Sequence, residues 1–322
     1  MAQPTNLYDS YDAEGKAEDV SDLIHNISPT ETPVLTMAGT TKATAKLHQW
    51  QEDVLRAPAA NAALEGDDAG LTDGTPTDQI VNPTQISETA FGVSGTLEVV
   101  AKYGRDSELA YQAAKSAREL KTDVDFIICG LNQAAVQADS PRNTASLEAQ
   151  LKTNTSIGGG AGANGGWNGT VINARTDGTL RAFTTTLLDD AIELGWNNGA
   201  RLEGMMLVMG ASQKRNFATF DGVGARRTDA ESRAVVNTAD IYMSLYGDMK
   251  VVPSRHIRKT AGVDRNVFGI DPEYLKVAYL RPWQQYDLAK TGDSIQRQMV
   301  VEWCLEVCNE KAHILVADVD NS

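Results

Sequence analysis

The feature that most constrains this chain is one long amphipathic segment, Gly104 to Asp139. Asp106, Ser107 and Glu108 offer capping oxygens and negative charge at its start, and Pro141 marks its end. Apolar residues recur at three- and four-residue steps, the period of one helical face: Leu109, Ala113, Ala117, Leu120, Val124, Ile127, Leu131 and Ala135. At about 1.5 Å per residue, the segment predicts a helix roughly 50 Å long, across which elements from both chain halves lie. An ordinary long core helix fits the same periodicity.

The apolar face changes in size along this segment. Alanines in the first half leave room for close backbone approach, whereas Val124, Ile127, Ile128 and Leu131 in the second half need a thicker core. We therefore expect the second half to anchor a sheet, and Leu131→Ala to cost about 2 to 5 kcal/mol of stability. Three polar residues fall away from the apolar face: Arg118, Thr122 and Asp125.

The composition indicates a folded protein without a membrane span. The chain has 322 residues, 42% of them hydrophobic, which is enough for one large domain or two smaller ones. It contains no run of about eighteen apolar residues and no basic, then apolar, N-terminal signal, so we expect a cytosolic protein. Its three cysteines, Cys129, Cys304 and Cys308, predict small buried side chains in a reducing compartment.

The formal net charge of -14 argues against a surface that grips phosphates by counterion release. An acidic protein can still enclose nucleic acid, because a wall that repels phosphate does not adhere to its contents. Charge alone does not choose between these two cases.

The first ninety-five residues predict an arm and a long excursion. Residues 1–45 mix polar stretches with apolar positions, which favours an arm with one short helix near Val20 to Ile27 and an extended part around Pro29 and Pro33. Lys46 to Leu55 and Pro83 to Val93 are strand-like and flank a segment with little apolar content. A loop of this length inside a domain predicts a hairpin-like partner surface.

A glycine tract follows the long segment, from Ile157 to Gly169. Gly160, Gly162 and Gly165 have the spacing of a dinucleotide-binding motif. That motif needs a strand before it and a helix start directly after it, and neither is expected here. We therefore favour a flexible loop over a nucleotide site.

The region from Leu151 to about Gly262 predicts a mixed α/β lobe. Its expected elements are a helix from Thr184 to Asn197 closed by Gly199, a buried strand from Met205 to Met209, a helix capped by Ser212, and a hairpin from Asp240 to Val252 turning at Gly247-Asp248. The last part of the chain returns to strands. Val267 to Leu280 is β-rich, and the alternation from Met299 to Val307 predicts a strand with one core face.

The sequence holds no recognisable catalytic or metal-binding pattern. None of the four histidines lies beside a serine or cysteine in a nucleophile elbow. On an extended strand, Cys304 and Cys308 would lie about 13 Å apart, too far to share one tetrahedral ion with His313. The acidic segment from Glu65 to Gly74 lacks the ligand spacing of a calcium loop. We therefore expect no catalytic residues, no cofactor and no metal.

One basic cluster and one acidic loop offer complementary charge. The cluster consists of Arg255, His256, Arg258, Lys259 and Arg265, and the loop carries Glu65, Asp67, Asp68, Asp73 and Asp78. We expect the two to meet across a contact between subunits, with a merely solvated loop as the alternative.

Five segments, in this order, resemble a known family. They are EDVSDLIHNISPTETPVLTMAG, HQWQEDVL, NPTQISETAFGVSGT, ELAYQAAKSARELKTDVDF and LRPWQQYDLAKTGDSIQRQMVVEWCLEVCNEKAH. Together they look like the major capsid protein of tailed bacteriophages, in the subfamily that lacks a long cleaved N-terminal scaffold region. The resemblance covers both ends and the middle of the chain and is weakest between residues 151 and 262.

The resemblance implies an α+β fold with four parts. They are an N-terminal arm (1–45), an extended β-hairpin loop (46–95), a peripheral domain with the long spine helix (96–150 and 263–322), and an axial α/β domain (151–262). Trp50, Val54 and Leu55 would anchor the base of the extended loop. Arg118, off the apolar face of the spine, would chiefly affect contacts between subunits.

The implied function is structural. Copies of the chain would assemble into pentamers and hexamers that form an icosahedral head enclosing double-stranded DNA, in a virion assembled in the host cytoplasm. Implied partners are the chain itself, a portal, possible scaffold and decoration proteins, and packaged DNA bound non-specifically, with no membrane. Three alternatives stay open: a bacterial protein-enclosing nanocompartment shell, a cytosolic α/β nucleotide-binding enzyme that uses the glycine tract, and a phage tail or decoration protein.

Overall fold

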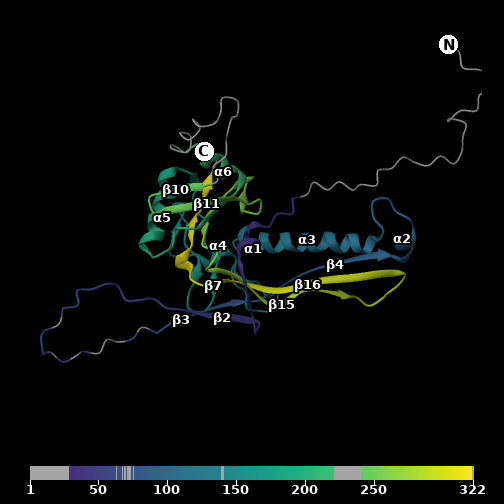
Figure 1. Cartoon of the computed structure of the whole chain (residues 1–322), viewed down its shortest axis with the longest axis horizontal. Helices are drawn as coiled ribbons and strands as arrows, with labels where there is room; N and C mark the ends of the chain where they lie inside the picture. Colours follow the sequence, from purple (N-terminus) through teal and green to yellow (C-terminus); the bar gives the residue numbers. More distant parts are fainter. Residues whose placement is uncertain are drawn as a thin grey trace, which may run out of the picture.

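The computed structural model describes residues 29–62, 64–66, 68, 70, 74, 76–138, 141–220 and 241–320. A long four-stranded sheet with a helix along it forms one side of the molecule, and a six-stranded sheet forms a lobe on the other (Figure 1). A narrow hairpin projects from the body near their junction. Within the described ranges, no helix is long and apolar enough to cross a bilayer.

The four-stranded sheet draws its strands from both ends of the chain. Its order is β1 (Gly39–Lys42), β15 (Leu275–Asp287), β16 (Ser294–Val307) and β4 (Gln85–Ser94). β16 runs antiparallel to both of its neighbours, β15 and β4, and β1 lies parallel to β15 at the edge. The sheet therefore combines strands from the first third of the chain with strands from the last third.

The long helix α3 (Glu108–Cys129) lies along this sheet, as Figure 1 shows. Ser107 is its N-cap as predicted, since Ser107 Oγ accepts a hydrogen bond from Ala110 N at 3.1 Å. With 22 residues it is about 33 Å long, so the predicted extent from Gly104 to Asp139 was wrong.

The helix stops early because the chain after Gly130 has other backbone partners. Gln133 N donates to Ser146 Oγ at 3.0 Å, and Val136 forms an isolated bridge with Asn143. These bonds compete with the helical pattern. Leu131 and Ala135 of the predicted face therefore lie outside α3.

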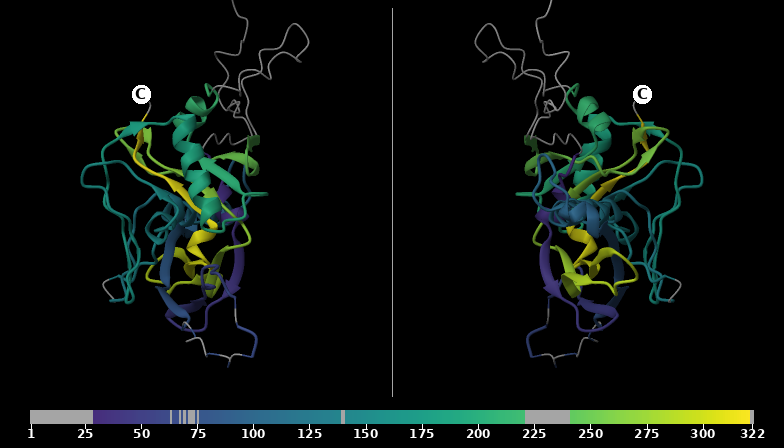
Figure 2. Two further views of the ribbon diagram at one scale, coloured as in Figure 1. Left: turned by 90° about the vertical axis from the view of Figure 1, so that its left-hand side faces the viewer. Right: turned by 90° about the vertical axis from the view of Figure 1, so that its right-hand side faces the viewer.

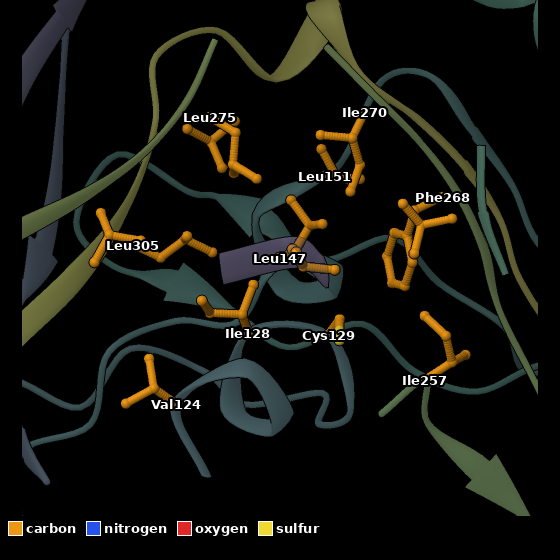
Figure 3. Close-up of a cluster of buried hydrophobic side chains, with 14 of the residues drawn as sticks. Val124, Ile128, Cys129, Leu147, Leu151, Ile257, Phe268, Ile270, Leu275 and Leu305 are labelled. Carbon is orange, nitrogen blue, oxygen red and sulfur yellow. The ribbon is translucent and has the colours of Figure 1, made fainter. Parts of the chain in front are cut away.

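The second half of α3 does pack against the sheet, as expected. Leu120, Val124 and Ile128 are at most 1% exposed and belong to one core with Trp303 and Leu305 of β16. Figure 3 shows part of this core, where the helix meets side chains from several strands. Leu131 is only half-buried, so the expected cost of about 2 to 5 kcal/mol belongs to Ile128→Ala instead.

Asp125, which lies off the apolar face, is nevertheless fully buried. Its Oδ1 accepts a hydrogen bond of 2.7 Å from Leu35 N in the short helix α1 (Pro33–Met37). Pro33 begins that helix, because a first-turn proline needs no N–H partner, so the predicted extended conformation there was wrong. The helix predicted near residues 20–27 lies outside the described residues.

The lobe is a mixed sheet covered by two helices, as the sequence predicted for an α/β unit. Its order is β10 (Ile241–Ser244), β11 (Gly247–Pro253), β9 (Met206–Met209), β14 (Val267–Ile270), β17 (Ile314–Val316) and β5 (Thr155–Ser156), with α5 (Thr185–Asn197) and α6 (Ala211–Phe217). Leu188 and Ile192 of α5 pack against Ile314 in one buried cluster. Thr184 caps α5, as predicted.

Two local predictions in the lobe were wrong. Gly210, not Ser212, is the N-cap of α6, and both the backbone N–H and the hydroxyl of Ser212 donate to Asp264 Oδ2. The β10–β11 hairpin turns at Leu245 and Tyr246, since Ser244 pairs with Gly247. The first error arose because Asp264, which binds Ser212, lies on a distant strand. The second arose because the sequence does not reveal that the turn of the hairpin lies two residues earlier than Gly247-Asp248.

The C-terminal strands divide between the two sheets. β15 and β16 lie beneath α3, but β14 pairs with β9 and β17 pairs with β14 in the lobe. The boundary expected at residue 263 therefore does not follow the sheets. Short elements complete the described fold: α4 (Leu147–Gln150), β6 (Gly166–Trp167), β7 (Ile172–Asn173), β8 (Arg181–Ala182), β12 (Lys259–Thr260), β13 (Val263–Asp264), η2 (Glu310–Ala312) and β18 (Val319–Asp320).

β16 is buried on both faces between Val300 and Val307, although one core face was predicted. The odd-numbered residues face the α3 core, and the other face carries Glu302, Cys304 and Glu306. Glu302 forms ion pairs with Arg142 at 2.8 Å and Arg281 at 2.7 Å. The alternation is real, but the polar face is covered by protein instead of water.

Candidate assembly surfaces

An antiparallel hairpin projects from the body, away from α5 and α6 of the lobe (Figure 1; Figure 2). β2 (Leu47–Glu52) pairs with β3 (Asp78–Pro83) along its whole length, so the excursion is a hairpin, but its second strand was expected at Pro83 to Val93 and instead lies in the segment expected to be a loop. The excursion is shorter than residues 46–95, because β4 belongs to the four-stranded sheet. Beyond the paired strands, Leu55 is 91% and Leu64 80% exposed. These leucines are candidate contacts with another molecule.

The acidic loop residues lie on the same projection. Glu65, Asp68 and Asp78 are exposed, whereas Asp67 and Asp73 lie outside the described residues. The tip of the hairpin therefore combines exposed leucines with negative charge.

The base of the hairpin is fixed by buried polar bonds. Asn82 Nδ2 donates to Leu305 O at 2.6 Å, and Asn82 Oδ1 accepts from Ala145 N at 2.9 Å. Trp50 is half-buried and packs against a cluster that includes Ile80, as predicted for an anchor. Val54 is 55% exposed, so Val54 and Leu55 do not anchor the base.

The short helix α2 (Gly95–Val99) lies at the far end of the four-stranded sheet (Figure 1). Its Glu98 is half-buried, whereas its apolar Leu97 and Val99 are exposed. Glu98 Oε1 accepts from Ser107 Oγ at 2.7 Å and Glu98 Oε2 accepts from Glu108 N at 3.0 Å, at the start of α3. The Ser107 hydroxyl, more than the opposing effect of desolvation, holds the pKa of Glu98 below its ordinary value. Lys102 Nζ donates to the carbonyl of Leu97 at 2.7 Å.

The outward residues of this segment form an exposed apolar group, which we call the α2 surface. It consists of Leu97 (43% exposed), Val99 (87%), Val100 (53%) and Tyr103 (58%). A helix normally buries its apolar side chains. Because Glu98 and Lys102 hold this one in the opposite orientation, the α2 surface is a candidate docking site.

The exposed side of α3 carries three basic residues beside the acidic Glu119 and Asp123. Lys115, Arg118 and Lys121 are all exposed and recur every three residues along one side of the helix. Lys115 lies 3.7 Å from Glu119, and this pair is itself about half exposed. Arg118, predicted at a contact between subunits, therefore lies where a neighbour could reach it.

Most residues of the basic cluster, which was predicted to meet the acidic loop of another subunit, form ion pairs within the same chain. Arg265 is 7% exposed and pairs with Asp318 and Asp177, and Arg258 pairs with Asp177 and lies 3.3 Å from Glu148. An inter-subunit role for Arg258 and Arg265 was therefore wrong, because both are held by partners between the sheets. Lys259 lies 3.7 Å from Asp264, and Arg255 lies 3.8 Å from Glu31; both side chains are at least half exposed.

Asp318 is the centre of this buried ion network. Arg175 donates to both oxygens of Asp318, at 2.9 and 2.8 Å, and Arg265 Nε donates at 3.0 Å. Gly158 N and Gly178 N donate to it at 3.1 and 3.0 Å. Burial alone would raise the pKa of Asp318, but the bonds from the two arginines outweigh it and hold this pKa well below its usual range.

The glycine tract closes around this network instead of forming a flexible loop. A Cβ on Gly158 would meet Thr179 O at 2.0 Å, and one on Gly162 would meet Gly158 O at 2.5 Å. The short strands β6 and β7, and no helix, come directly after the start of the tract, so the context of a dinucleotide-binding motif is missing, as expected from the sequence. The glycines allow backbones to approach Asp318 closely.

The α2 surface and the Asp318 network were both missed from the sequence. For α2, the signal is the mixture in LEVVAK of four apolar residues with one acidic and one basic residue, too short to show a period. For Asp318, the partners lie more than fifty residues away along the chain, so no local pattern connects them.

Comparison with known proteins identifies the family to which this sequence is similar. The sequence matches the family described as SU10 major capsid protein over residues 3–320. A stretch of 141 residues is 36% identical to the major capsid protein of Escherichia phage Phieco32. That stretch spans 43% of this chain but only 40% of that relative.

Two solved structures share the fold. The capsid protein of cyanophage A-1(L) superimposes with a TM-score of 0.69 at 14% identity, covering 99% of this chain and 100% of that chain. The encapsulin of a holo-SrpI complex from Synechococcus elongatus gives a TM-score of 0.57 at 10% identity, covering 96% of this chain and 94% of that chain. At these identities the likeness concerns the fold alone.

A long helix on an elongated sheet, a separate α/β lobe and a projecting hairpin make up the fold of tailed-phage major capsid proteins. The chain belongs to the SU10 major capsid protein family. Its role is therefore structural, which confirms both the resemblance carried by the five sequence segments and the expectation that the protein is not an enzyme.

Proposed function

We propose that copies of this chain assemble into pentamers and hexamers that form an icosahedral head around double-stranded DNA. The observation that carries the proposal is the family match over nearly the whole chain, together with a fold built to project surfaces at both ends. In this assignment the β2–β3 hairpin is the extended loop, α3 with its sheet is the peripheral domain, and the lobe is the axial domain. Residues 1–45 are the N-terminal arm, of which α1 and β1 are docked on the body.

The proposed contact joins the hairpin tip of one copy to the α2 surface and the exposed side of α3 of the next. The tip exposes leucines among acidic residues, and the receiving region exposes apolar residues followed by Lys115, Arg118 and Lys121. The two regions lie toward opposite ends of the long axis (Figure 1). A contact between two different patches is heterologous, and such contacts close into rings. Apolar and charge complementarity both support it.

This contact takes the place of the predicted pairing between the acidic loop and the whole basic cluster. Arg255 and Lys259, whose side chains are 66% and 50% exposed, remain candidates for a second charged contact. Each contact is small, so a stable wall requires many of them acting together.

Electron microscopy of the purified chain tests the shell function. Polyhedral particles or five- and six-membered rings are expected, and a monomer or dimer at high concentration would remove the proposal. The proposed contact has a separate test, Val99→Asp. Val99 is 87% exposed, so the melting temperature should stay within about 1 °C of wild type while particles are lost, since surface changes rarely alter stability by more than about 0.5 kcal/mol.

A matched control for this variant is Leu180→Asp, an exposed leucine on the lobe (39%) outside the proposed contact. Leu55→Asp at the hairpin tip should reproduce the assembly defect of Val99→Asp, whereas Leu180→Asp should assemble. Normal particles from both Val99→Asp and Leu55→Asp would exclude the contact but leave the shell function standing.

The proposed partners beyond the chain itself are a portal, possible scaffold and decoration proteins, and packaged DNA, with assembly in the host cytoplasm. The net charge of -14 supports a wall that DNA does not adhere to. Nuclease-protected DNA in native particles is the expected result.

A protein-enclosing compartment is the second candidate, and the likeness to the encapsulin from Synechococcus elongatus favours it. Particles that protect a protein cargo and no DNA would support this alternative over a phage head.

A further inference from the structure

The inner side of β2 carries three side chains in a row, because alternate residues of a strand share a face. His48 lies nearest the body, with Nε2 at 2.9 Å from Glu306 Oε2 on β16. Trp50 follows and packs against the cluster that contains Ile80. Glu52 comes last, where the paired strands end, and shares a cavity with Glu310 of η2.

This inner side is fixed at one end and open at the other. The body end is held by the Asn82 bonds and by Thr84 Oγ1, which donates to Glu302 Oε1 at 3.0 Å. The outer end spans a cavity of about 240 Å³, lined by Trp50, Glu52 and Glu310 among others. A hairpin with one fixed end and a cavity beneath the other has room to change its angle to the body.

The charges around Glu52 make this outer end unusual. Glu52 Oε1 is buried without a hydrogen bond of good geometry from the described residues, although the Glu310 backbone N–H and the Trp50 side chain lie close enough to favour the charged form in part. Burial first, and then the negative charge of Glu310, raise the pKa of Glu52 to about 7. Glu310 is fixed in place, because its Oε2 accepts hydrogen bonds from Lys152 N at 3.0 Å and Thr153 N at 2.9 Å.

The other charged groups facing this site do not neutralise Glu52. Lys311 on η2 lowers the pKa of Glu52, but less than burial and Glu310 raise it. Asp78, the register partner of Glu52 on β3, adds negative charge. The Lys152 ammonium lies 3.4 Å from Trp167 O across the cavity. The His48–Glu306 pair lies farther along β2, toward the fixed end.

We propose that Glu52 makes the outer end of the β2–β3 pair a pH-sensitive hinge. With Glu52 protonated, β2 lies against η2 and the hairpin angle is held. When Glu52 ionises, its repulsion from Glu310 and its gain in hydration open the outer end of the hairpin. The hinge would let identical copies of the chain hold Leu55 and Leu64 of the hairpin at different angles to the body.

Hydrogen–deuterium exchange on the purified full-length chain tests this hinge. The readout is the protection of backbone amides in the outer half of β2 and β3, corrected for the intrinsic pH dependence of exchange. Wild-type protection should fall about tenfold between pH 5.5 and pH 8, the factor that corresponds to one pKa unit of differential proton binding. Glu52→Gln should remove this dependence and stay protected at pH 8.

The matched control is Asp53→Asn, which removes the same charge one residue beyond the end of β2, where the side chain is exposed. It should keep the wild-type pH response. Glu310→Gln provides a second variant and should reduce the response, since the opposing charge is gone. A wild-type response in Glu52→Gln, or an equal loss in Asp53→Asn, would overturn the proposal. The unassembled chain suffices, so a failure of shell assembly leaves this result independent.

Discussion

Two regions of this molecule bury a carboxylate, and they treat it in opposite ways. Asp318 is fully buried between the sheets and receives hydrogen bonds from Arg175 and Arg265. Glu52 is half-buried at the outer end of the β2–β3 pair and faces a second carboxylate, Glu310. Compensation holds the pKa of Asp318 below its usual range, whereas burial and repulsion raise that of Glu52.

The difference shows where the fold is rigid and where it can move. Asp318 joins the glycine tract, Arg175 and Arg265, which come from three separate parts of the chain, so its charge holds the lobe together. A buried charge of this kind is stable only while its partners are present. No arginine pairs with Glu52, and Lys311 and the Glu310 backbone N–H offset its burial only in part, so its charge is relieved most easily by proton binding or by movement.

The largest expected effect is that of Asp318→Asn, which keeps the shape of the side chain but leaves two buried arginines without their shared counter-charge. Breaking a buried ion pair by removing one partner costs about 3 to 5 kcal/mol. Urea unfolding of the full-length chain measures the loss. Asp287→Asn is the control, because Asp287 is 75% exposed beside Arg297 and its loss should cost less than about 0.5 kcal/mol.

Equal costs for these two variants would mean that the Asp318 network does not hold the lobe together. The pH dependence gives a second check. Because the pKa of folded Asp318 is depressed, its contribution is present at neutral pH and is lost as pH falls below about 4, the value in an unfolded chain. The Asp318→Asn variant should lack this part of the acid transition.

A smaller effect is expected for Glu148→Gln within the same network. Glu148 is fully buried and pairs with Arg175 and Arg258, yet burial outweighs both arginines and raises its pKa. A glutamine keeps a carbonyl oxygen as the acceptor for Arg175 and removes a charge that burial disfavours, so the two effects offset each other and we expect a change of at most about 1.5 kcal/mol in urea unfolding at pH 7. A loss as large as that of Asp318→Asn would show that the two carboxylates contribute equally and would blur the comparison.

Local patterns predicted the elements that depend on local physics. Ser107 and Thr184 cap their helices, the strand-like segment from Lys46 to Leu55 contains β2, and the apolar face of α3 meets the sheet at Val124. Five short segments were enough to indicate the family. Where capping, periodicity and pairing act within a few residues, the sequence contains the needed information.

Long-range partners account for the rest. The end of α3, the split of the C-terminal strands and the N-cap of α6 all depend on residues far away in the chain. The same holds for Arg265, whose charge suggested a surface role until Asp318 and Asp177 were found beside it. A charged residue's role depends on its neighbours in space, which sequence spacing does not give.

The smallest effect, and the sharpest test of the comparison, is that of Glu52→Gln on overall stability. Glu52 has a folded pKa of about 7 against an ordinary value of 4.5, so the folded state retains its proton where the unfolded chain releases it. Stability is therefore lost as pH rises from about 4.5 to 7, and the penalty is constant above that range. Glu52→Gln should raise the free energy of unfolding by about 1 kcal/mol at pH 8, a discounted figure for a half-buried group that movement can relieve, and leave it unchanged near pH 4.5. Urea unfolding at both pH values measures the difference. Destabilisation at pH 8 would mean that the Glu52 charge is compensated as that of Asp318 is, and the contrast between a fixed and a movable region would fail.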